Sequence, residues 1–535
     1  MRVKTCVNDG LSVAITDDPV SFEEAVKDPR WNEAMQCEIL SIKKNDTWLL
    51  TDLPFGVIPL KLKWIFRTKL TETGAIDKFK ARLVVKGCSQ KYGIDYTEVF
   101  APVARWDTIR TLLAFAAFHG YEVYQLDVKS AFLYGELAED VYVEQPQGFE
   151  VAGEDSKVYK LKKALYGLKQ APRAWYSRIE TYLIKKGFER SCYEHTLFIK
   201  RAGEDILIVS IYVDDLLYTS SSNGLITEFK EAMQAEFEMT DLGRMRYFLG
   251  VEVTQSQAGI FICQQKYARE VLERFNLQHC SHAHNPIVPG VKLTKAGDGV
   301  LVNSTDYKRL VGSLLYITAT RPDLMFVVCL LSRFMEMPTR QHMLAAKRVL
   351  RYIKGTMQFG IWYKRKQEEE SLVGYTDSDY AGDADDRKST SGYAFFLAGG
   401  AVSWASKKQP VVTLSTTEAE FIAAAYCASQ CVWLRRILEQ IGWKGDGNTA
   451  TTIMCDNSSA IKLSKNPVMH GRSKHIDVRF HFLRELANDG VIVLEHCGSQ
   501  QQVADIMTKA LKLETCQLLR TKLGMVDIRE FEGEG

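Results

Sequence analysis

Apolar and polar residues follow two different periods in the first half of the chain. Spacings of three and four between apolar residues predict helices at 25–45 and 108–120. Alternation predicts strands, including WIFRTKL, ARLVVKG and VYQLDVKSAF. The last of these strands carries a carboxylate, Asp127, among its apolar residues. Because a charge is costly to bury, Asp127 is an unusual residue for such a strand.

Two further apolar runs flank a pair of aspartates in DILIVSIYVDDLLYTSS, residues 205–221. This pattern predicts a β-hairpin with Asp214 and Asp215 at its turn. Adjacent carboxylates framed by apolar strands repel each other and lose hydration. We therefore expect a cation to neutralise them.

The second half of the chain predicts a helical segment and then a mixed one. A linker containing Pro and Gly at 285–290 precedes helical patterns at 307–335 and 342–355. The acidic run at 367–372 marks a further boundary. Strands, a long helix and more strands are predicted after it.

Length and composition narrow the class of protein. A chain of 535 residues predicts three or four domains of about 150 residues each. With 46% hydrophobic and 25% charged residues, it is neither collagenous nor mostly disordered. The longest uncharged stretch, 389–406, carries Gly, Ser and Thr throughout and fails as a membrane span. Twelve scattered cysteines and the lack of a signal-peptide pattern favour a soluble intracellular protein.

The formal net charge of +2 conceals three basic blocks. Residues 61–90 hold eight basic and two acidic side chains, 157–186 hold nine and one, and 340–366 hold eight and none. Each block alone is typical of a solvated face. Together they favour a polyanionic partner, because each phosphate contact gains from counterion release. The segment HCSHAH at 279–284 has metal-ligand residues but no second ligand pair, which favours a polar loop.

Phosphoryl transfer from nucleoside triphosphates uses two divalent ions about 3.5–4 Å apart, held by carboxylates from separate segments. Asp127 and the pair Asp214 and Asp215 are suited to that purpose. One ion would activate a primer 3′-hydroxyl, and the other would hold the triphosphate and the leaving pyrophosphate. An Asp-Asp pair alone is weak support, since most such pairs lie in surface turns.

A set of motifs in fixed order strengthens this interpretation. Through them the chain resembles the reverse transcriptase part of the Pol polyprotein of copia-type long-terminal-repeat retrotransposons. The motifs are NDTW (45–48), KWIFRTKL (63–70), KARLVVKG (80–87), FAPVAR (100–105), QLDVKSAFLYGEL (125–137), ALYGLKQAPRAWY (164–176), IYVDDLLYT (211–219) and DLGRMRYFLGVEV (241–253).

The resemblance implies a role for residues at several of these positions. It makes Asp127, Asp214 and Asp215 the metal-binding triad of a polymerase palm. The other implied positions are Lys80 and Arg82 at the incoming triphosphate, with Lys78 as an equal candidate for the lysine, Phe132 under the sugar or else in the core, Gln170 against the nascent base pair with Gly167 and Pro172 shaping its turn, and Tyr247–Gly250 as a primer-gripping hairpin or else a core strand.

A second group of acids follows after residue 372. Two of them end predicted strands and two lie early in predicted helices, at capping-box patterns that start at Ser415 and at Ser499. Such acids can converge on one metal pair that activates water, which is the chemistry of a nuclease. The four are Asp377, Glu420, Asp456 and Asp505.

This part of the chain resembles the ribonuclease H of the same retrotransposon family, and the resemblance implies that these four acids are its catalytic and metal-binding quartet. Asp379 and Asp383 are competing acids, which we interpret as facing solvent or as contacting the ligand residues without binding the metal. His475 and His481 have no assigned role. The matching motifs are YTDSDYAGD (375–383), STSGYAFFLAGGAVSWASKKQ (389–409), LSTTEAEFIAA (414–424), CDNSSAI (455–461), RSKHIDVRFHFLRE (472–485) and VADIMTKAL (503–511).

The expected fold class is α+β, a right-hand polymerase with fingers, palm and thumb, followed by an α/β ribonuclease H-like domain. Motifs for a zinc knuckle, an aspartic protease and an integrase are missing, so we expect the chain to be the C-terminal part of a polyprotein. The expected segments are a helical lead-in (1–45), fingers and palm (46–284), a helical thumb or connection (285–370), a ribonuclease H domain (371–512) and a tail (513–535).

The expected function is RNA-directed DNA synthesis with removal of RNA from the hybrid. Its expected cofactor is Mg²⁺, two ions per active site, with Mn²⁺ as a substitute. The expected partners are an RNA template, a DNA primer, the RNA–DNA hybrid and dNTPs, and no membrane partner is expected. The expected location is the cytoplasm, within a virus-like particle, and later the nucleus. The alternative is an inactive or domesticated retroelement fragment that only binds nucleic acid. A small-molecule phosphotransferase is disfavoured, because a GxxxxGK[ST] loop is missing.

Overall fold

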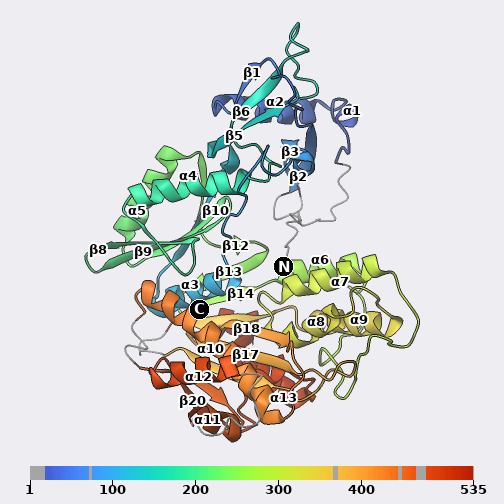
Figure 1. Cartoon of the computed structure of the whole chain (residues 1–535), viewed down its shortest axis with the longest axis vertical. Coiled ribbons are helices and arrows are strands. Elements are labelled where there is room, and N and C mark those ends of the chain that lie inside the picture. The colour runs from blue at the N-terminus through green and yellow to red at the C-terminus, as the bar shows by residue number, and fades with distance from the viewer. Residues whose placement is uncertain (1–17, 71–74, 366–370, 444–448, 466–476, 534–535) are drawn as a thin grey trace. The chain divides into compact units, whose positions relative to one another are not determined.

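The computed structural model describes residues 18–70, 75–365, 371–443, 449–465 and 477–533 (Figure 1). Helices and strands are both present in these ranges and come largely in separate runs, which confirms the α+β class. None of the helices described there is long and apolar enough to cross a membrane. The chain forms two compact units, the first from 1–104, 125–218 and 222–243 and the second from 105–124, 219–221 and 244–535. Each unit combines several predicted segments, so the predicted domain boundaries stay predictions.

In the first unit, helix α2 lies against a two-stranded sheet. Its apolar face includes Trp31, whose ring contacts that of Phe66 edge-on with 5.4 Å between the centroids. Aromatic contacts of this kind add stability beyond the area that they bury. The elements are α1 (Phe22–Ala25), α2 (Pro29–Lys44), β2 (Leu62–Leu70) and β3 (Ile76–Val85), which confirm the predicted helix and strand pair.

Two further sheets complete the first unit. One has the order β1-β6-β5, and the other has the order β11-β4-β10-β9-β8-β7, with β4 beside the predicted hairpin β9–β10. Helix α5 packs on the larger sheet through Phe229, whose ring lies 5.1 Å from that of Tyr218. The elements are β1 (Trp48–Thr51), η1 (Gly87–Ser89), β4 (Val123–Val128), η2 (Ala131–Tyr134), β5 (Glu136–Val143), β6 (Val158–Lys163), α4 (Ala171–Lys185), β7 (Glu189–Arg190), β8 (Leu197–Ala202), β9 (Asp205–Tyr212), β10 (Asp215–Ser220), α5 (Asn223–Glu236) and β11 (Met239–Arg244).

The second unit contains a cluster of helices around one apolar core. Inside it, Arg321 and Asp323 form a buried ion pair at 2.8 Å, and the hydroxyl of Tyr352 donates to Asp323 at 2.8 Å. The predicted helical patterns at 307–335 and 342–355 are confirmed. The elements are α6 (Gln265–Arg274), α7 (Ser304–Ile317), η3 (Pro322–Leu324), α8 (Met325–Ser332) and α9 (Arg340–Gly355).

Two five-stranded sheets complete the second unit. One has the order β12-β13-β14-β15-β21. In the other, β18-β17-β16-β19-β20, the strands β16, β19 and β20 run parallel to one another. Strand β17 pairs antiparallel with both of its neighbours, β16 and β18. The remaining elements are α3 (Trp106–His119), β12 (Tyr247–Phe248), β13 (Val251–Ser256), β14 (Gly259–Cys263), β15 (Phe359–Lys364), β16 (Val373–Ser378), β17 (Thr390–Leu397), β18 (Gly400–Lys408), α10 (Thr416–Gln440), β19 (Thr451–Cys455), α11 (Ser458–Lys465), α12 (Asp477–Asn488), β20 (Ile492–His496), η6 (Val503–Met507), α13 (Leu513–Lys522), β21 (Met525–Asp527) and α14 (Ile528–Gly533).

Helix α3 is anchored within this second unit by a buried arginine. Arg110 donates to the carbonyl of Val402 in β18 at 2.7 Å and to that of Ala319 at 2.9 Å. Its guanidinium carbon lies 3.7 Å from the ring centroid of Trp404. Gly120, with φ +70°, ends the helix as predicted, because a left-handed residue at that position favours glycine.

Candidate active sites

Three carboxylates of the first unit meet where β4 lies beside the β9–β10 hairpin. Asp127 belongs to β4, Asp214 lies at the turn of the hairpin, and Asp215 begins β10. The Val128 N–H donates to the carbonyl of Asp214 at 2.9 Å and so fixes the turn against β4. The structure thus brings together the three acids that the sequence predicted as one group.

Burial and mutual repulsion disfavour the ionised forms of these acids. Burial raises the pKa of Asp215 to about 6, and the charges of Asp214 and Asp127 raise it as well. A 2.9 Å hydrogen bond from Gln125 has the opposite effect and lowers this pKa. Burial, then the charge of Asp214, also raises the pKa of Asp127, whereas Lys80 lowers it. A cation stabilises carboxylates in such a state. Oxygen ligands of this kind fit a hard divalent ion such as Mg²⁺.

The hairpin turn that carries Asp214 has a strained backbone. Val213 has φ +56°, a left-handed conformation that β-branched residues rarely adopt. Trp175 of α4 is 1% exposed, and its Nε1–H donates to the carbonyl of Val213 at 2.6 Å. Trp175 therefore holds the peptide next to the aspartate pair. Conformations of this kind persist only where surrounding contacts enforce them.

The predicted triphosphate-binding residues lie on β3. Lys80 and Arg82 face Arg67 and Ile65 of the neighbouring strand β2. Lys80 is half-buried and lowers the pKa of Asp127 more than the exposed Lys78 does. The arrangement therefore favours Lys80 over Lys78 as the lysine nearer to the acids. Contact of either lysine with a triphosphate stays a prediction.

Gln170 does not present its amide to an open site. It is 4% exposed, accepts a hydrogen bond from Gln90 at 3.0 Å and donates one to the carbonyl of Asp95 at 2.8 Å. These bonds tie the segment before α4 to the 90–95 loop. The predicted contact of Gln170 with a base pair stays a prediction, and its amide is already occupied within the protein.

Tyr166 lies beside two of the predicted nucleotide-binding residues, Arg82 and Phe132. No role was predicted for Tyr166 from the sequence. The guanidinium carbon of Arg82 lies 5.2 Å from its ring centroid, and the ring of Phe132 lies 5.6 Å from it. The next residue, Gly167, has φ +95°, and a Cβ there would lie 2.3 Å from the carbonyl oxygen of Val85. Glycine is thus required beside Tyr166. Phe132 also packs against the core, so its two predicted roles both stay open.

Four carboxylates of the second unit come from four elements around the mixed sheet. Asp377 lies in β16, Glu420 in α10, Asp456 directly after β19, and Asp505 in η6. One oxygen from each of Asp377, Glu420 and Asp456 lies within 4.8 Å of the other two. The charge of Asp377 also acts on the pKa of Asp505. The predicted quartet is therefore gathered in one place.

The electrostatics of this quartet call for a cation. Burial raises the pKa of Glu420 to about 9, and the charges of Asp377 and Asp456 add to it. Burial and the charge of Asp377 raise the pKa of Asp505 to about 7. Glu420 Oε2 is buried and has no hydrogen-bond partner among the described residues. Because such an oxygen is costly to leave unsatisfied, the donor set fits a divalent cation.

Hydrogen bonds from neighbouring segments orient these acids. The hydroxyl of Thr508 donates to Asp377, and the Ser378 N–H donates to Glu420 at 3.3 Å. Gln502 donates to the carbonyl of Thr376 at 2.9 Å and so joins the segment that carries Asp505 to β16. The carboxylates thus have fixed positions on the sheet.

The predicted start of α10 is confirmed, and that of the helix around Asp505 is wrong. Ser415 caps α10 by accepting from the Glu418 N–H at 3.2 Å. Asp505 instead lies in the 3-10 helix η6, which begins after Gln502. The side chain of Gln502, not that of Ser499, accepts from the first turn of η6. A longer amide side chain can cap in place of a serine, and the pattern of residue types did not reveal this.

The competing acids Asp379 and Asp383 have other partners. Asp379 accepts from the Thr390 N–H, and burial raises its pKa to about 6. Asp383 pairs with Lys408 at 2.6 Å and with Arg333 at 3.1 Å, and its side chain is 7% exposed. Asp383 therefore does not face solvent. Both acids organise the loop between β16 and β17.

Other predicted contact regions are placed as follows. Residues 247–250 form a hairpin between β12 and β13, and its contact with a primer stays a prediction. On α9, Arg351 donates to the carbonyl of Ser281 at 2.8 Å, and Lys354 donates to that of Cys280. These two basic side chains hold the segment 279–284, which is a loop as predicted.

The two histidines without an assigned role are placed only in part. His481 is exposed on α12, and His475 lies outside the described residues.

Comparisons with known proteins agree with the motifs. Residues 45–289 match the family "Reverse transcriptase (RNA-dependent DNA polymerase)". The chain is 41% identical over 528 residues to the "Retrovirus-related Pol polyprotein from transposon TNT 1-94" of Nicotiana tabacum, covering 96% of this chain and 39% of that protein. It is 39% identical over 519 residues to the corresponding polyprotein from transposon RE1 of Arabidopsis thaliana, covering 97% of this chain and 35% of that protein. The chain thus spans well under half the length of these relatives.

A shorter relative is matched almost from end to end. The putative transposon Ty5-1 protein of Saccharomyces cerevisiae is 35% identical over 303 residues, covering 56% of this chain and 98% of that protein. Among solved structures, a prototype foamy virus protease-reverse transcriptase is 11% identical with a TM-score of 0.25, covering 93% of this chain and 78% of that one. A Mycobacterium tuberculosis ribonuclease H domain is 13% identical with a TM-score of 0.20, covering 28% of this chain and 96% of that one. By its sequence relatives and its family match, the chain belongs to the copia-type retrotransposon Pol polyproteins and carries their reverse transcriptase region.

Proposed function

We propose that this chain copies RNA into DNA and removes the RNA strand from the resulting hybrid, with a separate carboxylate centre for each reaction. The observation that carries the proposal is the presence of two acid groups, each assembled from different elements and each with raised pKa values. A pair of divalent ions bound at such a centre lowers the pKa of the attacking hydroxyl or water and stabilises the departing oxygen.

At the polymerase centre, Asp127, Asp214 and Asp215 would hold the ions. The half-buried Lys80 lowers the pKa of Asp127, so its positive charge acts at the acid group. An incoming triphosphate would meet the same positive charge. A guanidinium such as that of Arg82 is suited to bind phosphate oxygens in a bidentate manner. The hydrogen bonds from Trp175 and Gln125 keep the hairpin and Asp215 in place before substrate arrives. This preorganisation lowers the cost of reaching the transition state.

At the nuclease centre, Asp377, Glu420, Asp456 and Asp505 would hold the ions. Glu420 has a raised pKa, so it would release a proton when cations bind. Thr508 and Ser378 orient two of the ligands through hydrogen bonds. Binding of the duplex would rest on phosphate contacts, and it should therefore weaken with salt.

The proposed partners are an RNA template, a DNA primer, their hybrid and dNTPs. We propose that the protein acts in the cytoplasm within a virus-like particle and later in the nucleus. A fragment that only binds nucleic acid would not need seven acids in two oriented groups.

The nuclease half of the proposal is tested with labelled RNA annealed to DNA. The wild type should cut the RNA only with Mg²⁺, and Asp456→Asn should abolish the cutting. The control Asp386→Asn changes an exposed acid of the same unit and should cut normally. Persistent cutting by Asp456→Asn would remove Asp456 from the proposed centre.

A further inference from the structure

A lysine lies within ion-pair distance of the acid quartet in the second unit. Lys509 Nζ is 2.8 Å from Asp505 Oδ1 and 3.6 Å from Asp377 Oδ2. A lysine side chain is a cation at neutral pH. The ammonium therefore places a positive charge beside two of the four carboxylates.

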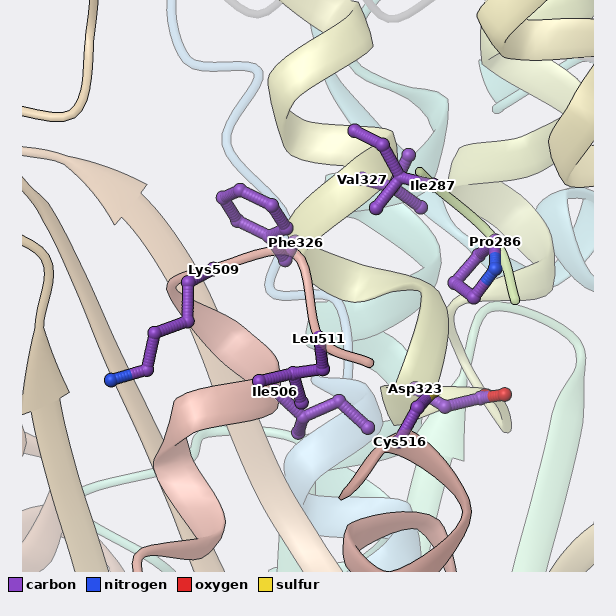
Figure 2. A pocket seen from close by; sticks show the side chains of 9 residues that line it. All are labelled: Pro286, Ile287, Asp323, Phe326, Val327, Ile506, Lys509, Leu511 and Cys516. Carbon is purple, nitrogen blue, oxygen red and sulfur yellow. The ribbon is translucent and has the colours of Figure 1, made fainter. Parts of the chain in front are cut away.

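The position of Lys509 is set by the backbone and by its aliphatic stem. Its N–H donates to the carbonyl of Asp505 at 3.1 Å, which closes the turn that follows η6 and brings the two residues together. The stem lines a small cavity together with Phe326, Ile506 and Leu511. Figure 2 shows that the amine points away from the other side chains of this cavity. The stem thus lines this cavity, and the charged end reaches the carboxylates, with the side chain 42% exposed.

We propose that Lys509 is the resident cation of the quartet, a positioning residue that holds Asp505 and Asp377 together and lowers the affinity of the site for divalent cations. An ammonium within ion-pair distance of a ligand oxygen repels a second cation and competes for that oxygen. Divalent ions therefore bind at the expense of the Lys509 contact with Asp505. The inference rests on the proposed nuclease centre, but it concerns cation binding and not the rate of cutting.

Two variants isolate the charge of Lys509 from its packing. Lys509→Met keeps an unbranched apolar stem against the cavity and removes the charge. Lys509→Arg keeps the charge. The control Lys512→Met removes an exposed lysine three positions further along the chain. All variants are made in the full chain with Asp214→Asn and Asp215→Asn, so that the other acid group does not bind the ion.

Calorimetric titration with Mn²⁺ alone decides the proposal. Lys509→Met should bind Mn²⁺ at least about tenfold more tightly than its parent, because a nearby positive charge is gone. Lys509→Arg and Lys512→Met should bind as the parent does. Unchanged or weaker binding by Lys509→Met would overturn the proposal. Equal tightening by Lys512→Met would also overturn it, because the effect would then be one of net charge.

Thermal unfolding gives a second readout that does not depend on activity. In EDTA, Lys509→Met should unfold at a lower temperature than Lys509→Arg, because the carboxylates then repel each other unopposed. Saturating Mn²⁺ should remove most of this difference, and a difference that Mn²⁺ leaves intact would mean that Lys509 acts through packing. If Lys509→Met does not fold, Lys509→Gln replaces it with the same expected outcomes. If the parent shows no Mn²⁺ binding that Asp456→Asn removes, the proposed centre itself fails along with the inference.

Discussion

The indole N–H of Trp175 donates to the carbonyl of Val213 at 2.6 Å, directly before the aspartate pair of the β9–β10 hairpin. Val213 has φ +56°, and a conformation of this kind costs roughly 1–3 kcal/mol. The bond from a buried tryptophan of α4 offsets part of that cost. The position of the two carboxylates therefore depends on a helix that is not adjacent to them in the sequence.

Trp175→Phe should impair DNA synthesis selectively. The change keeps an aromatic ring and removes the donor, which costs roughly 1–3 kcal/mol when a buried carbonyl is left unpaired. We expect primer extension to slow by about tenfold, with little change in the cutting of hybrid RNA. The matched control is Trp64→Phe, which removes an indole bond to the carbonyl of Gln147 at 3.2 Å. Equal losses of extension in the two variants would contradict a special role for Trp175.

Tyr166 and Gln170 should behave differently when replaced. Tyr166→Leu removes the ring between Arg82 and Phe132, so we expect a higher KM for dNTPs and weaker discrimination against ribonucleotides. Gln170→Leu removes the acceptor of the Gln90 side-chain N–H and the donor to the carbonyl of Asp95, so we expect lower thermal stability. Steady-state kinetics with dNTPs and rNTPs, together with melting curves, check both outcomes. A selective loss of discrimination in Gln170→Leu alone would reverse these assignments.

Glu420 should give the stability of the metal-free protein a pH dependence. Its pKa of about 9 in the folded state lies above the ordinary value of 4.5. Stability from this group is therefore complete below about pH 4.5 and is lost as the pH rises toward 9. We expect the Tm in EDTA to fall over this range, and Glu420→Gln or added Mg²⁺ to flatten the profile. A profile for Glu420→Gln as steep as that of the wild type would refute the raised pKa.

The buried pair of Arg321 and Asp323 should matter for folding and not for chemistry. Both side chains are almost fully buried, and Tyr352 donates to Asp323. Asp323→Asn leaves the guanidinium uncompensated, which costs roughly 3–5 kcal/mol for pairs of this kind. Urea unfolding should show this loss. The double variant Arg321→Met with Asp323→Asn should lose less than Asp323→Asn alone, and a larger loss would contradict the argument from uncompensated charge.

Much of both candidate sites was predictable because their acids lie in short local motifs. Asp214 and Asp215 are framed by apolar runs, and Asp377 and Asp456 follow apolar strands, so each position is marked by its immediate neighbours. Lys509 also carried a usable signal, since it lies only four residues after Asp505. That spacing is present in VADIMTKAL (503–511).

Other features depend on contacts that the sequence does not mark. Gln170 and Tyr166 lie four residues apart in one loop, and a loop has no period that tells which side chain faces a site. Arg110 contacts the carbonyl of Val402, which is 292 positions away, and only the tertiary fold brings them together. Arg351 lies in one of the basic blocks that favour a polyanionic partner, yet it bonds to the 279–284 loop. A charged residue on a helix can serve either purpose, and the pattern alone does not decide between them.

Primer extension on an RNA template tests the central claim most directly. A DNA oligonucleotide annealed to RNA is incubated with dNTPs and with either Mg²⁺ or EDTA, and the wild type is compared with Asp214→Asn and Asp456→Asn. We expect Mg²⁺-dependent extension by the wild type, none by Asp214→Asn, and wild-type extension with intact template RNA for Asp456→Asn. Failure of the wild type to extend the primer with Mg²⁺, or extension by Asp214→Asn at the wild-type rate, would contradict the account.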